Sequence, residues 1–211
     1  MILLEMSELT GILLAGGKSR RLGRDKAQEV IGGRRIIDRV IDTLRTISTS
    51  QTVVVDRWER IEELNLDSQI NYVVDSYDNS GSLGGLYSGL EQSPTRWALL
   101  VACDMPFLSA RLFEFMVTKI SNEDLDVVIP RFEGRLQTTH ALYSKSCLEH
   151  IDGRLKDGQL KMDGYFNNVN VCEISQDEIL KIEGSKYSFF NVNTAEDLDL
   201  AIRMDKNTYG D

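Results

Sequence analysis

Residues 18–26, KSRRLGRDK, carry five cationic side chains and one acidic side chain. The whole chain has a formal net charge of −9, so this positive charge runs against the overall balance. Gly16 and Gly17 directly precede the segment. Glycines let backbone N–H groups approach an anion with no Cβ in the way, and cations neutralise the anion's charge. The pattern therefore predicts an anion site, and a solvated cationic surface is the alternative.

Two familiar phosphate-binding motifs do not fit this segment. Its middle, Gly17-Lys18-Ser19, looks like the end of a P-loop. The P-loop pattern G-x-x-x-x-G-K-[ST] would then need a glycine at position 12, which is Ile12, and Gly11 misses by one position. The dinucleotide-binding pattern G-x-G-x-x-G is also absent. Any phosphate must therefore be bound in another way.

Two carboxylates follow apolar segments that are typical of buried strands. Asp75 follows residues 70–74, and Asp104 follows residues 97–103, WALLVAC. The glycine-rich segment likewise follows the apolar run LTGILL at residues 9–14. In mostly parallel sheets, ligands bind at the carboxyl ends of the strands. We therefore expect these three regions to meet at one edge of a sheet.

The apolar pattern predicts strands that alternate with helices. Helical spacing is clearest at residues 36–47, where apolar residues recur every three or four positions. Ser109 is typical of a helix N-cap, and Thr194-Ala195-Glu196-Asp197 resembles a capping box with Asp in place of Glu. Strands are expected at 9–14, 52–55, 70–74, 97–103, 127–129, 136–143 and 169–174, and further helices at 57–64, 86–92, 109–120, 145–151 and after Thr194.

This alternation predicts an α/β fold, with a mostly parallel, Rossmann-like sheet between two layers of helices. With 211 residues, we expect one domain over positions 1–211. Residues up to about 108 would form a nucleotide-binding half, and residues from about 109 to 211 an acceptor-binding half. The segment 75–85, DSYDNSGSLGG, is expected to be a loop.

Composition argues against several classes of protein. The acidic balance disfavours general nucleic-acid binding. No apolar run is long enough to span a bilayer, and Glu5 interrupts the apolar start, so we expect neither a signal peptide nor an anchor, and a cytoplasmic protein. No C-x-x-C pair occurs, which favours buried thiols over disulfides or a zinc site. The scattered cysteines and histidines are Cys103, Cys147, Cys172, His140 and His150.

The stretch from Leu14 to Lys26 reads L-A-G-G-x-S-x-R-L-G-x-D-K, which resembles the signature of glycosyltransferase-A-like nucleotidyltransferases. The ending G-x-D-K is similar to that of molybdenum cofactor guanylyltransferases, whereas the sugar-phosphate branch usually has a proline before the lysine. Further segments match that family in its order: Val74-Asp75, Ser82-Leu83-Gly84-Gly85, Cys103-Asp104-Met105-Pro106, Gln137 to Tyr143 (QTTHALY) and Asn191-Val192-Asn193-Thr194.

The resemblance implies a fold of the nucleotide-diphospho-sugar transferase type. It also implies transfer of GMP from GTP to molybdopterin or molybdenum cofactor, with release of pyrophosphate. Mg²⁺ would be the cofactor, with Asp104 as its ligand. Transient contact with cofactor-insertion proteins or molybdoenzymes is expected. The implied catalytic residues are Arg21, Lys26 and Asp104; the nucleotide-binding residues are Leu14, Ala15, Gly16, Gly17, Lys26, Asp75, Gly85 and Asp104; and the acceptor-binding residues are Gln137, His140, Asn191 and Asn193.

Each role has a plainer alternative. Arg21 and Lys26 are alternatively surface cations, and Asp75 and Asp104 turn residues. Asn193 is equally suited to a metal or phosphate contact and to stabilising the turn before the last helix. His140 is equally suited to the pterin side and to a structural role.

The sequence departs from the family pattern at three positions. Ser82 and Thr138 replace prolines, and Asp56 stands where relatives often have an Asn that contacts the nucleotide. An ionised Asp cannot donate a hydrogen bond, which leaves its role open. Two rival functions also remain: a cytidylyltransferase or other nucleotidyltransferase for a related phosphorylated acceptor, and a non-catalytic protein that binds nucleotide or pterin.

Overall fold

The computed structural model describes residues 9–16, 25–77, 79–120 and 124–209. Its strands within these residues are β1 (Leu9–Leu14), β2 (Val30–Ile31), β3 (Arg34–Arg35), β4 (Ser50–Val55), β5 (Asn71–Val74), β6 (Trp97–Ala102), β7 (Val127–Phe132), β8 (Arg135–Leu136), β9 (His140–Ser144) and β10 (Val171–Ile174). The α-helices are α2 (Ile36–Ile47), α3 (Glu59–Leu64), α4 (Gly81–Gln92), α5 (Ala110–Val117), α6 (Leu148–Lys156), α7 (Gln176–Leu180) and α8 (Ala195–Tyr209). Short 3-10 helices are η1 (Lys26–Gln28), η2 (Lys145–Cys147), η3 (Phe166–Asn168) and η4 (Ser185–Phe189).

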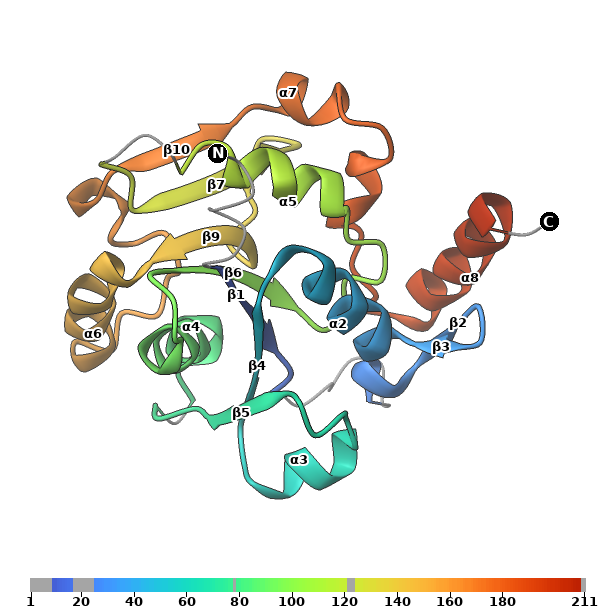
Figure 1. Cartoon of the computed structure of the whole chain (residues 1–211), viewed down its shortest axis with the longest axis horizontal. Coiled ribbons are helices and arrows are strands. Elements are labelled where there is room, and N and C mark those ends of the chain that lie inside the picture. Colours follow the sequence, from blue (N-terminus) through green and yellow to red (C-terminus); the bar gives the residue numbers. More distant parts are fainter. Residues whose placement is uncertain (1–8, 17–24, 78, 121–123, 210–211) are drawn as a thin grey trace.

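The central sheet of the described chain has eight strands in the order β10-β7-β9-β6-β1-β4-β5, with β8 paired to β7 (Figure 1). β1 pairs in parallel with both β4 and β6, β4 with β5, and β7 with β10. β9 is antiparallel to its two neighbours, β6 and β7. The predicted mostly parallel sheet is thus confirmed, and the carboxyl ends of β1, β4, β5 and β6 share one edge.

Successive side chains of the central strands enter two separate cores, one on each face of the sheet. In β6, Leu99 and Val101 pack in the core that contains α2 and α5, whereas Ala98 and Leu100 pack in the core that contains α4 and α6. This two-residue period is the ordinary alternation of a strand, here buried on both faces. The result is the expected arrangement of a sheet between two helical layers (Figure 1).

The prediction of a loop over residues 75–85 was wrong for residues 81–85, because α4 begins at Gly81. Glycines usually disfavour helices, but here they let α4 approach the sheet closely. A Cβ at Gly89 would lie 2.7 Å from Ile12 Cγ2, and a Cβ at Gly85 would lie 2.8 Å from Leu14 Cδ2. Tertiary packing therefore outweighs the local preference at these positions.

Two other differences concern short strands. The single strand expected at residues 136–143 is divided into β8 and β9, with a turn between them. The antiparallel β2–β3 hairpin around Gly32 and Gly33 was not predicted, because each strand has only two residues and carries no readable alternation. The hairpin packs against α8, which projects from the sheet (Figure 1).

Both predicted helix caps are present. Ser109 Oγ accepts a hydrogen bond from the Leu112 N–H at the start of α5. At the start of α8, Thr194 Oγ1 accepts from the Asp197 N–H, and Asp197 Oδ2 accepts from the Thr194 N–H. The capping box is therefore confirmed with Asp in the last position, and it fixes the chain directly after Asn193. None of the helices in the described ranges is long and apolar enough to cross a membrane.

Candidate active site at the carboxyl ends of β1 and β6

The strand order changes direction between β1 and β6. The chain passes from β1 to β4 and β5 on one side, and then returns to β6 on the other side of β1. In open α/β sheets such a reversal leaves a crevice at the carboxyl ends of the strands. Here the Cys103 N–H donates to Leu14 O at 3.2 Å, which holds the ends of β6 and β1 together directly before Asp104.

Gly16 is held against the neighbouring strand. A Cβ at Gly16 would lie 2.7 Å from the Asp56 backbone nitrogen, so only glycine fits there without a shift. The Ala15 and Gly16 N–H groups both donate to Val54 O, at 2.9 and 3.1 Å. The Gly16 N–H is thus engaged by β4, although the sequence analysis assigned it to a phosphate. Gly17 and Arg21, two further predicted site residues, lie outside the described residues.

Lys26, Asp104 and Asn193 meet at this edge from three distant parts of the chain. Lys26 Nζ lies 2.7 Å from Asn193 Oδ1 and 3.5 Å from Asp104 Oδ2. The Lys26 and Asp104 side chains are only 15% and 19% exposed. The Val192 N–H donates to Asp104 O at 2.9 Å, so the chain before α8 is fixed to the loop after β6. The sequence predicted that the segment ending at Lys26 and Asp104 share one edge of the sheet. It did not place Asn193 there, and the structure adds this residue to the contact.

Burial dominates the electrostatics at Asp104. It raises the pKa of the Asp104 carboxyl group above its usual value, and the nearby Lys26 ammonium acts in the opposite direction. Asp104 Oδ1 is buried and has no hydrogen-bond partner among the described residues. Burial and the Asp104 carboxylate also raise the pKa of Cys103 to about 12. The Cys103 thiol therefore stays protonated at neutral pH and is not an activated nucleophile.

The donor set at this point fits a hard divalent cation. It combines the unpartnered carboxylate oxygen of Asp104 with the amide oxygen of Asn193, and Mg²⁺ prefers oxygen ligands. No group of three or more His, Cys, Asp or Glu side chains suited to a metal occurs among the residues that the structure describes. A cation bound here would therefore depend on few protein ligands, which is usual for Mg²⁺ that also binds substrate phosphates.

Asp75 sits in a hydrogen-bonded turn at the end of β5. Its Oδ1 accepts from the Tyr77 N–H and from Ser88 Oγ, both at 3.0 Å. Ser88 is completely buried on α4 and also accepts from the Ser76 N–H at 2.9 Å. Ser80 Oγ approaches Asp75 Oδ2 at 3.4 Å but has a shorter contact to Tyr77 O, at 2.6 Å. The turn thus occupies Oδ1 and leaves Oδ2 as the better-placed acceptor for a ligand.

The predicted acceptor residues are not all brought to the same place. Asn193 contacts Lys26, as described above, whereas Asn191 Nδ2 donates to Phe189 O at 2.8 Å. The Gln137 amide lies 3.4 Å from the carbonyl oxygens of Phe132 and Arg135. These two side chains therefore contact backbone near the crevice.

His140 is enclosed in the core. It has no exposed surface and packs against Phe113 and Phe189, with ring centroids 4.5 and 4.8 Å away. Its Nε2 lies 3.2 Å from Ser188 Oγ. Burial lowers the pKa of His140 to about 3, which keeps the ring neutral. This placement favours the structural role that the sequence analysis held equally open.

The sequence analysis missed Arg60 on α3, whose side chain is only 9% exposed and forms an ion pair with Asp25. The hydrogen bond from Arg60 lowers the pKa of Asp25 below its usual value. Nothing in the charged segment ERIEEL distinguishes this arginine from a solvated one. Asp25, within the G-x-D-K motif, was the available signal.

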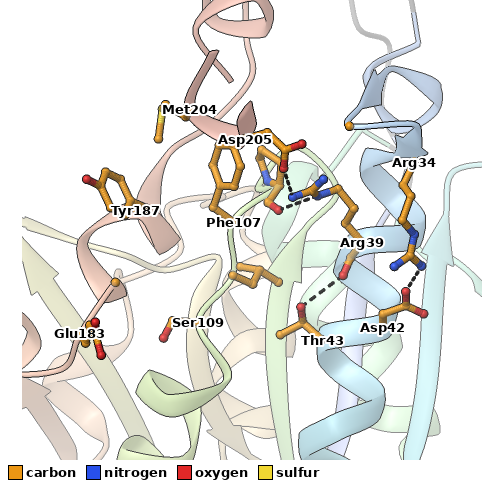
Figure 2. A pocket seen from close by; sticks show the side chains of 14 residues that line it. Arg34, Arg39, Asp42, Thr43, Phe107, Ser109, Glu183, Tyr187, Met204 and Asp205 are labelled. Carbon is orange, nitrogen blue, oxygen red and sulfur yellow. Dashed lines mark hydrogen bonds and ion pairs between the residues drawn. The ribbon is translucent and has the colours of Figure 1, made fainter. Parts of the chain in front are cut away.

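A pocket of about 720 Å³ lies beside the site, between α2, the loop after Asp104, and α8 (Figure 2). Arg39 crosses this region, with Nη2 2.6 Å from Asp205 Oδ1 and Nε 3.3 Å from Pro106 O. Its guanidinium carbon lies 5.6 Å from the centre of the Phe107 ring. Arg39 thus ties α8 to the loop that carries Asp104. The pocket lining, which the sequence did not predict, is Gly32, Arg34, Arg39, Asp42, Thr43, Pro106, Phe107, Leu108, Ser109, Glu183, Gly184, Tyr187, Met204 and Asp205.

Comparison with known proteins shows the family of this chain. The family model of the MobA-like NTP transferase domain matches residues 11–164. A molybdenum cofactor guanylyltransferase from Desulfosudis oleivorans is 33% identical over 197 residues, covering 93% of this chain and 95% of that protein. A probable molybdenum cofactor guanylyltransferase from Pelotomaculum thermopropionicum is 33% identical over 203 residues, covering 96% of each.

A solved structure has the same fold. The crystal structure of molybdopterin-guanine dinucleotide biosynthesis protein A from Archaeoglobus fulgidus aligns with a TM-score of 0.82, covering 94% of this chain and 99% of that one. Its sequence identity is 22%, so this likeness bears on the fold alone. The fold of this chain therefore belongs to a known architecture.

Proposed function

The chain belongs to the MobA-like NTP transferase domain family, and we propose that it transfers GMP from GTP to molybdopterin or molybdenum cofactor. An oxygen of the acceptor's phosphate forms a bond to the α-phosphorus of GTP, the bond from that phosphorus to the β-phosphate oxygen breaks, and pyrophosphate leaves. The observation that carries this proposal is the convergence of Lys26, Asp104 and Asn193 at the carboxyl ends of β1 and β6.

Lys26 supplies positive charge where two anions must approach each other. Phosphoryl transfer of this kind depends on positioning and on neutralising charge in the transition state. The Lys26 ammonium is mostly buried beside Asp104, so the surrounding water screens it less than it would a surface lysine. Arg21 is proposed to add charge for the triphosphate, on the strength of the sequence motif.

Asp104 and Asn193 would hold Mg²⁺. When bound, the cation would offset the negative charge of the phosphate oxygens and help to orient them. Asp104 provides the charge that attracts it, and Asn193 provides a neutral oxygen. Lys26 Nζ lies within 3.5 Å of an oxygen of each side chain, so both lie beside the same positive charge.

Asp75 is proposed to select the base. A carboxylate oxygen can accept from the N1–H and N2–H₂ of guanine, and cytosine lacks this pair of donors. The hydrogen bonds that hold Oδ1 in the turn would orient Oδ2 toward the base. Leu14, Ala15, Gly16, Gly17 and Gly85 would complete the nucleotide site, and Gln137 and Asn191 the acceptor side.

The test is pyrophosphate release with molybdopterin and each of GTP, CTP and ATP, with and without Mg²⁺. Release with GTP that requires both molybdopterin and Mg²⁺ is the expected result. Faster release with CTP would favour a cytidylyltransferase. Binding of GTP without release of pyrophosphate would favour a non-catalytic protein. The proposal also includes a cytoplasmic location and transient contact with proteins that insert or use the cofactor.

A further inference from the structure

One arginine touches both described ends of the glycine-rich segment. Arg60 is 8% exposed and extends from α3 toward the carboxyl end of β1. Its Nε donates to Ala15 O at 3.3 Å, directly after β1. Its Nη2 donates to Asp25 Oδ1 at 2.8 Å, and its Nη1 donates to Asp25 Oδ2. Residues 17–24 lie outside the described residues, and Arg60 contacts residues on either side of them, Ala15 and Asp25.

Asp25 links Arg60 to Lys26, the residue that follows Asp25 in the chain. Asp25 is the N-cap of η1, and its Oδ1 accepts from the Ala27 N–H at 3.1 Å. Lys26 is the first residue of η1, and its Nζ reaches Asn193 and Asp104. The direction in which Lys26 leaves the backbone therefore depends on how Asp25 is held.

The chemistry of the contact favours arginine. A guanidinium is planar and offers donors in a fixed fork, which matches the two oxygens of a carboxylate. Its remaining donors reach Ala15 O, as above, and Glu63 Oε2 at 3.1 Å. A lysine has one nitrogen and cannot reach all of these acceptors. Removing one partner of a largely buried ion pair would also leave the other partner's charge uncompensated.

We propose that Arg60 is a positioning residue for nucleotidyl transfer, which joins the end of β1 to Asp25 and thereby sets the position of Lys26. This inference rests on the proposed function of the same site. Arg60 itself does not need to contact the substrate, because it acts through Asp25. The proposal adds α3 to the elements on which the active site depends.

The test uses the full-length protein and four variants. Arg60→Gln removes the charge and the fork, and Arg60→Lys keeps the charge alone. Asp25→Asn removes the ion pair but keeps an oxygen that can accept from the Ala27 N–H. Arg131→Gln is the control, because Arg131 forms a two-point ion pair with Glu173, at 2.6 and 2.8 Å, that joins β7 to β10 and does not hold Asp25.

We expect Arg60→Gln to lower kcat at least about tenfold, with a smaller change in KM for GTP, because positioned charge acts mainly in the transition state. Arg60→Lys should recover part of the loss, and Arg131→Gln should match the wild type. Asp25→Asn should behave like Arg60→Gln, and it serves as the main variant if circular dichroism shows that Arg60→Gln does not fold.

A double-mutant cycle with Lys26→Ala separates positioning from general stability. If Arg60 acts through Lys26, Arg60→Gln should add less than about a twofold loss in the Lys26→Ala background. Full additivity in this cycle, or wild-type kcat in both Arg60→Gln and Asp25→Asn, would overturn the inference.

The dissociation constant for GTP is also measured for the four proteins of this cycle, because GTP binding can be measured without the acceptor. If the wild-type protein releases no pyrophosphate, the proposed function is wrong, and the cycle in GTP affinity decides the role of Arg60 separately. Coupling between Arg60 and Lys26 in that affinity supports the positioning role, and additive losses overturn it.

Discussion

Lys26 Nζ lies 2.7 Å from Asn193 Oδ1, although 167 positions separate the two residues in the chain. Lys26 begins η1, whereas Asn193 directly precedes the capping box of α8. The Asn193 N–H donates to Asp197 Oδ2 at 2.9 Å, so the first turn of α8 fixes this residue. The contact therefore joins a residue near the start of the described chain to one near its end, beside Asp104.

Replacing Lys26 with alanine should lower the rate of pyrophosphate release at least about tenfold, equivalent to roughly 1.4 kcal/mol of transition-state stabilisation. The reason is the loss of positive charge where the phosphates meet. Steady-state kinetics with GTP and molybdopterin would measure the change. Lys119→Ala is a suitable control, since Lys119 pairs with Glu178 at 3.2 Å on other elements. Unchanged turnover would remove Lys26 from the site.

Asp104→Asn should keep the fold but lose most magnesium-dependent turnover. The substitution is nearly isosteric, and a neutral amide costs less to bury than a carboxylate. It removes the charge that attracts a hard cation. Circular dichroism would check folding, and pyrophosphate release across a Mg²⁺ titration would check function.

GTP affinity without Mg²⁺ should change less than turnover does in the Asp104→Asn variant, because other residues also bind the nucleotide. A folded variant with normal turnover at ordinary Mg²⁺ would exclude Asp104 as the essential ligand. The non-catalytic alternative would then gain support.

Much of the fold follows from local patterns. Features that depend only on neighbouring residues were predicted. They are the apolar runs of β1 and β6, the helical spacing of α2, and the helix caps at Ser109 and Thr194. The start of α4 was not predicted, because Gly81, Gly84 and Gly85 favour a loop until Gly85 packs against the side chain of Leu14. That contact exists only in the folded protein.

The site residues likewise fall into those that the sequence predicted and those that depend on tertiary packing. Lys26, Asp104 and Asn193 occur in recognisable motifs. Strand topology explains why the segment of Lys26 lies near Asp104, whereas Asn193 is brought there by the Val192–Asp104 backbone bond and the cap of α8. Arg60 was missed because its burial depends on where α3 packs against the end of β1, and the sequence ERIEEL reads as a solvated helix. The role of Gly16 also differs from expectation, since β4 engages its N–H.

Asp75→Asn should reduce the preference for GTP over CTP and ATP. An amide oxygen can still accept from the Tyr77 N–H and keep the turn, so the variant tests the charge that faces the base. Competition between the three nucleotides, measured as kcat/KM ratios, would give the result. A site that hydrogen-bonds a substrate group discriminates strongly against analogues that lack it.

Asp67→Asn is the control for this experiment, because Asp67 pairs with Arg45 at 3.2 Å and both side chains are exposed. If the GTP preference survives in Asp75→Asn, the base is selected elsewhere, most simply by backbone groups of Leu14 and Ala15.

His140 should make the free energy of unfolding depend on pH between about 6.5 and 3. Burial lowers the pKa of His140 in the folded protein to about 3, from 6.5. A lowered folded pKa means that the unfolded chain takes up a proton first as the pH falls. The stabilisation is therefore complete above 6.5 and is lost below it, with a slope that approaches about 1.4 kcal/mol per pH unit for one proton.

Urea unfolding at several pH values would measure this slope in the wild type and in His140→Phe. Phenylalanine keeps an aromatic ring between Phe113 and Phe189 but cannot be protonated. The variant should show a shallower dependence over the same range, whatever its absolute stability. Equal slopes would mean that His140 does not cause the dependence.

Gly32→Ala should destabilise the fold more than Gly33→Ala, by at least about 2 kcal/mol, because it disrupts a mostly buried ion pair. Both glycines have positive φ, of 59° and 79°, so alanine is strained at either position. A Cβ at Gly33 meets nothing within 4 Å, whereas a Cβ at Gly32 would overlap Asp205 Oδ2. Asp205 would have to leave Arg39, and their side chains are only 10% and 16% exposed.

The double variant Gly32→Ala/Asp205→Ala identifies the cause of that difference. Once the Asp205 carboxylate is absent, the new methyl group no longer overlaps it, so Gly32→Ala should cost only about as much as Gly33→Ala does. The two changes should therefore be clearly non-additive in urea unfolding, as expected for residues in contact. If they are additive, strain at Gly32 alone explains the loss, and displacement of Asp205 from Arg39 does not contribute to it (Figure 2).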